Sequence, residues 1–174
     1  MDPRTNQILR AYGFADGGRL NEPLTSKIRR ADIFLSHAFH QVTAAHDLKS
    51  GAISALALII ANPGISQNEL AEQIGKDKSR VVAIVDALEQ RGFAQRSQSA
   101  ADRRKRTLFA TPEGDAFLNR LIEEVKETER QMLALVPQED LDTLEVLLER
   151  IVASCAREGS PFRLGESLRI GATF

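Results

Sequence analysis

Residues 65–92 restrict the fold of this chain most, because they indicate two short helices joined by a tight turn. Ser66 and Glu69 have the S-x-x-E spacing of a capping box, so a helix should begin directly after the serine. Gly75 can adopt the left-handed backbone that ends a helix at low cost. Asp77 is a favourable N-cap for the second helix. Two short helices around a glycine-containing turn predict a helix-turn-helix.

The second of these helices should end at Arg91 and Gly92 and have two contrasting faces. We expect the inward face to consist of Val81, Val82, Ile84, Val85 and Leu88. The outward face should carry Lys78, Ser79, Arg80, Ala83 and Asp86. Small and basic residues at the N-terminal end are typical of a helix that enters the major groove of DNA.

A polar loop between two short strands follows this helix. The strands are predicted over residues 93–96 and 106–110, and a hairpin directly after a helix-turn-helix is a wing. The tip and returning strand carry Arg103, Arg104, Lys105 and Arg106. Four adjacent cations repel one another and are stabilised mainly when phosphates neutralise them. We therefore expect the wing to contact DNA.

Charge is distributed unevenly, although the whole chain has a formal net charge of −1. Residues 76–106 contain nine Lys or Arg and four Asp or Glu, a net of +5. Residues 112–150 contain four basic and eleven acidic residues, a net of −7. A charge run is often only a solvated surface, but this basic run coincides with the predicted helix-turn-helix and wing. Its position favours nucleic acid as the partner.

Helical patterns flank the helix-turn-helix on both sides. Helices are predicted over residues 24–46, over 51–61, over 112–136 after the cap Thr111, and again after Pro137. The last helix has an apolar seam of Leu141, Leu144, Leu148, Ile151 and Cys155, which needs another helix to cover it. The sequence therefore predicts a mainly α fold with a small two-stranded β wing. This is a winged helix-turn-helix with a helical dimerisation region, paired with a second copy of the chain.

The domain boundaries follow from these elements. We assign residues 1–23 to an N-terminal arm, 24–62 and 112–157 to the helical dimerisation region, 63–111 to the winged helix-turn-helix DNA-binding domain and 158–174 to a C-terminal tail. With 43% hydrophobic residues and one cysteine, the chain is neither disordered nor stapled by disulfides. No apolar run approaches the ~18 residues that span a membrane, and no apolar signal core follows Met1. We therefore expect a cytoplasmic protein.

The order of these elements and two motifs resemble the MarR family of bacterial transcription regulators. The resemblance extends from Leu24 to Cys155 and is most specific between Gly75 and Gly114. There, KSRVVAIVDALEQRGF is similar to the recognition helix, and DRRKRTLFATPEG is similar to the wing and the start of the long helix. The resemblance implies a homodimer on a pseudo-palindromic operator. It also implies a recognition helix in the major groove and a wing arginine in the minor groove.

The resemblance also implies which residues touch DNA. It places base and phosphate contacts on the second helix and the minor-groove contact at Arg103, which Asp102 braces. The full predicted set is Lys76, Lys78, Ser79, Arg80, Asp102, Arg103, Arg104 and Arg106. Two departures from the family stand out: Ser99 and Ala100 replace a common Asp-Pro pair, and Ala83 replaces a frequent Arg. The operator sequence of relatives therefore does not carry over.

A small-molecule effector is implied by the resemblance alone, because relatives often bind phenolic or other aromatic carboxylates between the N-terminal helix pair and the long helix. The candidate lining residues are Phe34, His37, Ala38, Phe39 and Leu56, all of which are also ordinary core residues. The resulting hypothesis is a ligand-responsive regulator, a repressor that the effector releases from its operator.

Metal- and redox-responsive regulators of the same fold are the nearest alternatives. His37 and His40 share a helix face and His46 lies at its end, but the first half of the chain has no cysteine and only Asp32 and Asp47 are close. We therefore predict no metal site and no cofactor. The only thiol, Cys155, lies on the apolar seam of the last helix, where we expect it to be buried and inert.

An enzyme and an adaptor that does not bind DNA are the remaining classes. The sequence contains no G-x-S-x-G, P-loop, H-E-x-x-H or paired Cys-His signature, so we predict no catalytic activity. A dimeric interaction adaptor with the same fold would leave the cations of the wing without a stabilising partner. DNA binding is therefore the favoured function.

Overall fold

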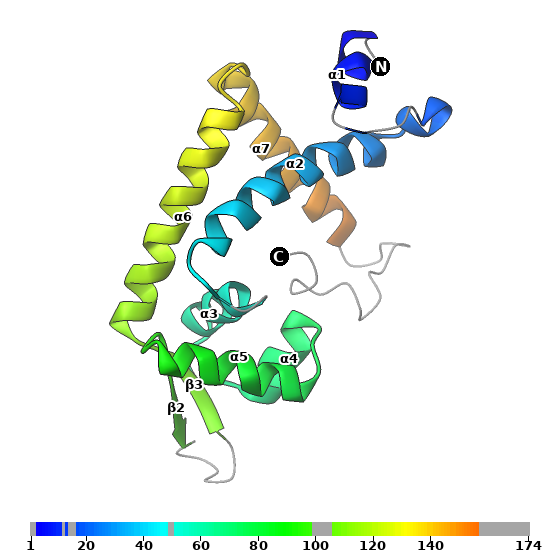
Figure 1. The fold of residues 1–174 in the computed structure, drawn as a ribbon. Helices are drawn as coiled ribbons and strands as arrows, with labels where there is room; N and C mark the ends of the chain where they lie inside the picture. Colours follow the sequence, from blue (N-terminus) through cyan, green and yellow to red (C-terminus); the bar gives the residue numbers. More distant parts are fainter. Residues whose placement is uncertain (1–2, 12, 14–16, 49–50, 99–105, 157–174) are drawn as a thin grey trace. The chain divides into compact units, whose positions relative to one another are not determined.

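The structure is a computed structural model that describes residues 3–11, 13, 17–48, 51–98 and 106–156 (Figure 1). The chain divides into two units, residues 1–41 and residues 42–174. In the described part of the chain, no helix is long and apolar enough to cross a membrane.

The first unit is helical from near its beginning. It contains helix α1 (Pro3–Ala11), the 3-10 turn η1 (Gly18–Asn21) and most of helix α2 (Leu24–Ala44). Arg30 on α2 donates a 2.6 Å hydrogen bond to the side-chain oxygen of Asn21, which ties η1 to α2. Residues 1–23 were predicted only as an arm, because their glycines are typical of loops and gave no sign of α1 and η1. Helix α2 begins where predicted and ends two residues earlier than predicted.

The second unit contains the remaining elements in one order. These are α3 (Ala52–Ala61), β1 (Ile65–Ser66), α4 (Gln67–Ile74), α5 (Lys78–Gln90), β2 (Ala94–Gln98), β3 (Arg106–Ala110), α6 (Pro112–Met132) and α7 (Gln138–Ala156). This mainly helical arrangement confirms the predicted fold class, a winged helix-turn-helix. Helix α5 is the predicted recognition helix, and β2 and β3 are the strands of the predicted wing.

The local signals around α4 and α5 act as the sequence predicts. The Ser66 hydroxyl accepts from the backbone N–H of Glu69, and the Glu69 carboxylate accepts from the N–H of Ser66 at 2.8 Å. Gly75 ends α4 with φ at +61°. Asp77 then caps α5 by accepting from the N–H of Arg80 at 2.9 Å. The helix-turn-helix is therefore encoded by caps within a few residues of each helix end.

One hydrophobic core is formed by side chains of α3, α4, α5, β2, β3 and α6. Its fully buried side chains include Leu56, Ile59, Leu70, Ile74, Val81, Val85, Leu88, Leu108 and Leu121. Each is worth about 1.5–3 kcal/mol relative to an exposed position. We expected Val82 on the inward face, and this prediction is wrong, because Val82 is 43% exposed. One residue is about 100° of helical rotation, so Val82 turns away from the stripe that begins at Val81.

The sheet has three antiparallel strands in the order β1-β3-β2. Strand β2 pairs with β3 from Ala94 opposite Ala110 to Gln98 opposite Arg106. The returning strand has the predicted bounds, and the first strand lies slightly further along the chain than predicted. Strand β1 is an addition to the two-stranded wing, and it pairs Ile65 with Leu108. A two-residue strand is too short to show an alternating pattern in the sequence.

The last two helices differ from the prediction in length and burial. Thr111 caps α6 as expected, but the helix ends at Met132 and not at Val136, so its length is about 32 Å. Helices usually end at or before the residue that precedes a proline, here Pro137. Leu141 is half-buried, but the other apolar residues of α7 are exposed, including Leu144 (50%) and Val152 (66%). Cys155 is exposed as well, so the expected burial is wrong for the single chain, which does not cover its own seam.

Candidate nucleic-acid interface

The N-terminal end of α5 presents the predicted base-reading residues to solvent. Lys78, Ser79 and Arg80 are all exposed, and the Arg80 side chain is 72% exposed. Asp77 organises this end, because it caps the helix, accepts from the Ser79 hydroxyl and lies 3.5 Å from the Arg80 guanidinium. The Ser79 hydrogen bond and then the Arg80 N–H hold the pKa of Asp77 below its ordinary value. The carboxylate therefore stays charged and keeps the first turn of α5 in place.

Lys76 is placed differently from the exposed residues of α5. It is half-buried, and a Cβ atom built on Gly51 would lie 2.7 Å from its Cε. The aliphatic part of Lys76 thus lies over the N-cap of α3, where Gly51 has φ at +85°. A long basic side chain can cover apolar surface with its stem while its ammonium stays in water.

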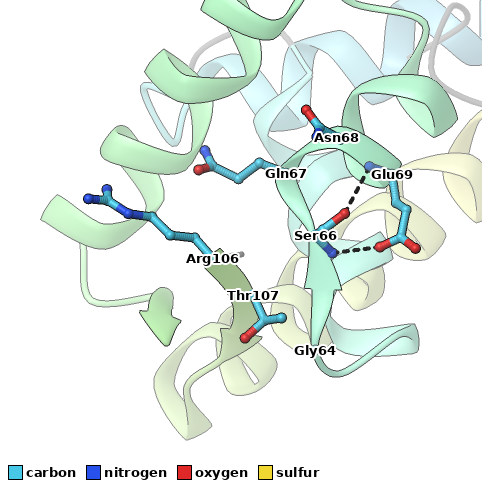
Figure 2. A pocket seen from close by; sticks show the side chains of 7 residues that line it. All are labelled: Gly64, Ser66, Gln67, Asn68, Glu69, Arg106 and Thr107. Atoms are coloured by element: carbon cyan, nitrogen blue, oxygen red, sulfur yellow. Dashed lines mark hydrogen bonds between the residues drawn. The ribbon is translucent and has the colours of Figure 1, made fainter. Parts of the chain in front are cut away.

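A pocket of about 620 Å³ lies where β3 begins beside the start of α4 (Figure 2). Its lining is Gly64, Ser66, Gln67, Asn68, Glu69, Arg106 and Thr107. Arg106 and Gln67 extend in the same direction from the two elements. The Gln67 amide nitrogen is buried and has no hydrogen-bond partner among the described residues. The guanidinium and the amide together offer donors to an anionic oxygen, whereas the Glu69 carboxylate is already used by the capping box.

Not every cation of the basic segment is free to meet DNA. Arg96 on β2 is only 15% exposed and contacts two carboxylates of α5: Asp86 at 2.7 Å and Glu89. Its backbone N–H also donates to Glu89 at 2.7 Å. Arg91, at the end of α5, donates to the backbone oxygens of His46 and Asp47. Neither of these pairings was predicted from the sequence, where Arg91 marked the end of a helix and Arg96 the end of a strand.

A partial signal for the Arg96 pairing exists in the sequence. Asp86 and Glu89 are three residues apart, so they share a face of α5. An arginine on the strand that follows is a natural partner for such a face. The sequence has no equivalent signal for Arg91, because its acceptors are backbone oxygens more than forty residues away.

The remaining predicted site residues lie either outside the described residues or in separate units of the chain. Asp102, Arg103 and Arg104 lie outside the described residues. Of the predicted effector lining, Phe34, His37, Ala38 and Phe39 lie on α2 in the first unit, whereas Leu56 is fully buried in the core of the second. The pocket therefore stays a prediction. Within the described residues there is no group of three or more His, Cys, Asp or Glu placed to hold a metal ion.

Comparison with known proteins decides the family. A model of the MarR family matches residues 46–105. A protein of Thauera aromatica named as a transcriptional regulator for the hcr operon is 31% identical over 135 residues, which are 77% of this chain and 81% of the relative. The chain belongs to the MarR family. As a MarR-family transcriptional regulator it binds DNA and is not an enzyme, which confirms both predictions.

Two solved structures are similar to this MarR-family chain. The transcriptional repressor CouR, solved bound to a 23-mer DNA duplex, is 33% identical with a TM-score of 0.64. The match covers 80% of this chain and 99% of that one. MarR from Escherichia coli has a TM-score of 0.63 at 19% identity, covering 74% of this chain and 96% of MarR, and shows the shared fold.

Proposed function

We propose that this MarR-family regulator is a homodimeric repressor that binds a pseudo-palindromic operator and is released by a small-molecule effector. The observation that carries the proposal is the exposed, cap-organised N-terminal end of α5 with Lys78 and Arg80. The similar protein CouR is a repressor that was solved on a DNA duplex, which supports the same activity here.

The DNA contacts fall into two classes. Arg80 reads base edges in the major groove, where a bidentate pair with guanine is worth about 1–3 kcal/mol of discrimination. Lys78 and Ser79 contact bases or phosphates beside it. Arg106, together with Gln67, contacts a phosphate from the pocket at the start of β3. Lys76 and the wing residues Asp102, Arg103 and Arg104 complete the interface, with Arg103 in the minor groove.

Dimerisation rests on the apolar face of α7. Leu144, Leu148 and Ile151 are 50%, 39% and 39% exposed, and they recur at three- and four-residue steps. An exposed apolar stripe on a long helix is stabilised when a second helix covers it. A second copy of the chain supplies that helix, and two-fold symmetry then presents two recognition helices to half-sites about 34 Å apart.

The effector is proposed to be a phenolic or other aromatic carboxylate, on the family resemblance and on the lining predicted above. It acts by favouring a spacing of the recognition helices that does not fit the operator. A preference of a few kcal/mol for that spacing is enough for a useful switch.

A selection from a random duplex library tests the DNA-binding proposal. The expected product is an inverted repeat, and the expected sedimenting species is twice the 19.2 kDa mass of one chain. Arg106→Ala should weaken binding to all sequences alike and lower the salt slope by about 1. Arg130→Ala on α6 is the matched control and should change neither quantity. A monomer, or a chain that ignores duplexes at low salt, would refute the proposal.

The effector proposal needs its own measurement. A panel of aromatic carboxylates is titrated into the protein–duplex complex, and fluorescence anisotropy reports release. At least one member should lower the affinity for the selected duplex. If no member of the panel changes the affinity while DNA binding itself is intact, this effector class is wrong.

A further inference from the structure

The C-terminal end of the recognition helix is held by one side chain to the turn that follows α2. Arg91 donates from Nη1 to the backbone oxygen of His46 and from Nη2 to that of Asp47, both at 2.8 Å. Its Nη2 also lies 3.6 Å from the Asp47 carboxylate. Charge-assisted bonds to two successive carbonyls fix the guanidinium in one orientation. The end of α5 therefore follows the position of this turn.

The same turn is fixed to α6. The His46 Nε2 lies 2.8 Å from an oxygen of Glu124 on α6. The imidazole ring packs edge-on against Phe117, with the ring centroids 5.3 Å apart. Phe117 in turn stacks on Phe93, the second residue after Arg91, with centroids 4.5 Å apart. These contacts connect the turn after α2, the residues that follow α5, and α6 between Phe117 and Glu124.

The start of α6 also abuts the exit of α5 directly. The N–H of Thr111 donates to the backbone oxygen of Phe93 at 3.0 Å, and its hydroxyl donates to that of Gly92. Gly114 lies so close that a Cβ atom built on it would be 2.1 Å from the Phe93 oxygen. Backbone packed this closely leaves little freedom at the N-terminal end of α6. The turn at His46 provides a second connection between α5 and α6, because it binds Arg91 and also contacts Glu124 further along α6. This connection sets the direction of α5.

We propose that Arg91 and His46 are positioning residues for DNA binding: through them the turn that follows α2 and helix α6 set where the recognition helix lies. Arg91 is at the opposite end of α5 from Lys78, about 20 Å away at 1.5 Å per residue. It therefore acts through the placement of α5 and not through the base-reading end. The inference rests on the proposed function, because a fixed placement of α5 matters most when two copies must match two half-sites.

Spacing preference is the readout that separates positioning from contact. Two duplex sets are used: the inverted repeat selected by the wild type, and the same half-sites moved apart or together by one base pair. The wild type should prefer its selected spacing by about tenfold or more, since half-site separation mirrors protein geometry. Arg91→Ala and His46→Leu should reduce this preference to within about threefold, with an unchanged salt slope. Arg91→Lys, which keeps the positive charge but has one donor nitrogen in place of two, should restore part of it.

The controls use neighbours on the same helix. Glu124→Gln removes the charge that faces His46, whereas Glu123→Gln alters the adjacent carboxylate, which pairs with Lys126. Glu124→Gln should weaken the spacing preference and Glu123→Gln should not. A salt slope that falls by about 1 in Arg91→Ala would make Arg91 a phosphate contact and overturn the proposal. Unchanged spacing preference in Arg91→Ala and His46→Leu would overturn it as well.

A second measurement does not depend on DNA. Spin labels at Gln90→Cys and Ala116→Cys, in a Cys155→Ser background, report the distance between α5 and α6 within one chain when labelled protein is diluted with unlabelled protein. Arg91→Ala should broaden this distance distribution, and Glu123→Gln should leave it unchanged. If the wild type fails to bind any duplex, the proposed function fails, but this measurement still tests whether Arg91 fixes α5 relative to α6. An unbroadened distribution in Arg91→Ala would refute the positioning role alone.

Discussion

The Arg96 guanidinium on β2 lies 2.7 Å from the Asp86 carboxylate on α5. This pair ties the first strand of the wing to the recognition helix, and Glu89 on the same helix face binds both the side chain and the backbone N–H of the arginine. A cation that the sequence analysis counted in the net charge of the basic segment thus holds together the two elements that are proposed to contact DNA.

Loss of the Arg96 side chain should destabilise the fold. Arg96→Ala leaves Asp86 and Glu89 without their shared partner at a site where the arginine was only 15% exposed. We expect the free energy of unfolding to fall by about 2–3 kcal/mol, measured by urea denaturation. Arg130→Ala breaks a solvent-exposed pair with Glu127 and should cost much less. Equal losses for the two variants would show that the Arg96 pairs add nothing beyond a surface contact.

Gly114→Ala should be destabilising although alanine is the better helix former. An alanine in an exposed helix interior gains about 1 kcal/mol over glycine. Here the new Cβ would lie 2.1 Å from the backbone oxygen of Phe93, so the start of α6 must move. We expect a net loss of about 3 kcal/mol in thermal or urea unfolding. Gly75→Ala, which meets no atom within 4 Å but has φ at +61°, should lose only about 1–2 kcal/mol. A Gly114→Ala protein as stable as the wild type would contradict the close approach of Gly114 to the backbone of Phe93.

Arg80→Ala should relax sequence preference rather than abolish binding. Its guanidinium is exposed at the base-reading end of α5, and loss of one bidentate base contact costs about 1–3 kcal/mol at a single operator position. A repeated library selection should therefore return a motif with one degenerate base in each half-site. Recovery of the unaltered wild-type motif would remove Arg80 from base recognition.

The cap of α5 should weaken in acid. The hydrogen bonds from the Ser79 hydroxyl and the Arg80 N–H lower the pKa of Asp77 in the folded protein. A group with a lowered folded pKa stabilises the fold above its unfolded pKa, and this stabilisation is lost as the pH falls through the folded value. The loss should therefore appear below about pH 4, the ordinary range of an aspartate.

Asp77→Asn tests this assignment. Asparagine is also a good N-cap, so α5 should stay folded at neutral pH while its first turn loses the acid-dependent step. NMR titration of the Arg80 amide follows the change directly. An Arg80 amide that titrates equally in both proteins would show that another carboxylate is responsible.

The elements whose signals are local were predicted from the sequence. The capping box of Ser66 and Glu69, the glycine at position 75 and the Asp77 cap lie within a few residues of the helix ends that they define, and each acts as predicted. The exposed end of α5 with Lys78 and Arg80 follows from the same periodicity. Predicted helix lengths were less accurate where a single proline or glycine was the only signal for the helix end, as at the end of α6.

Amino-acid order alone therefore determined the helix-turn-helix, the wing and the family of this regulator, because caps, turns and helical faces depend on neighbours along the chain. Only the tertiary structure decided which charges remain for a partner. Arg96 and Arg91 are paired with groups on other elements, and strand β1 exists because β3 lies beside it. Such pairings depend on distances in space between residues that are far apart in the sequence, and no local pattern encodes those distances.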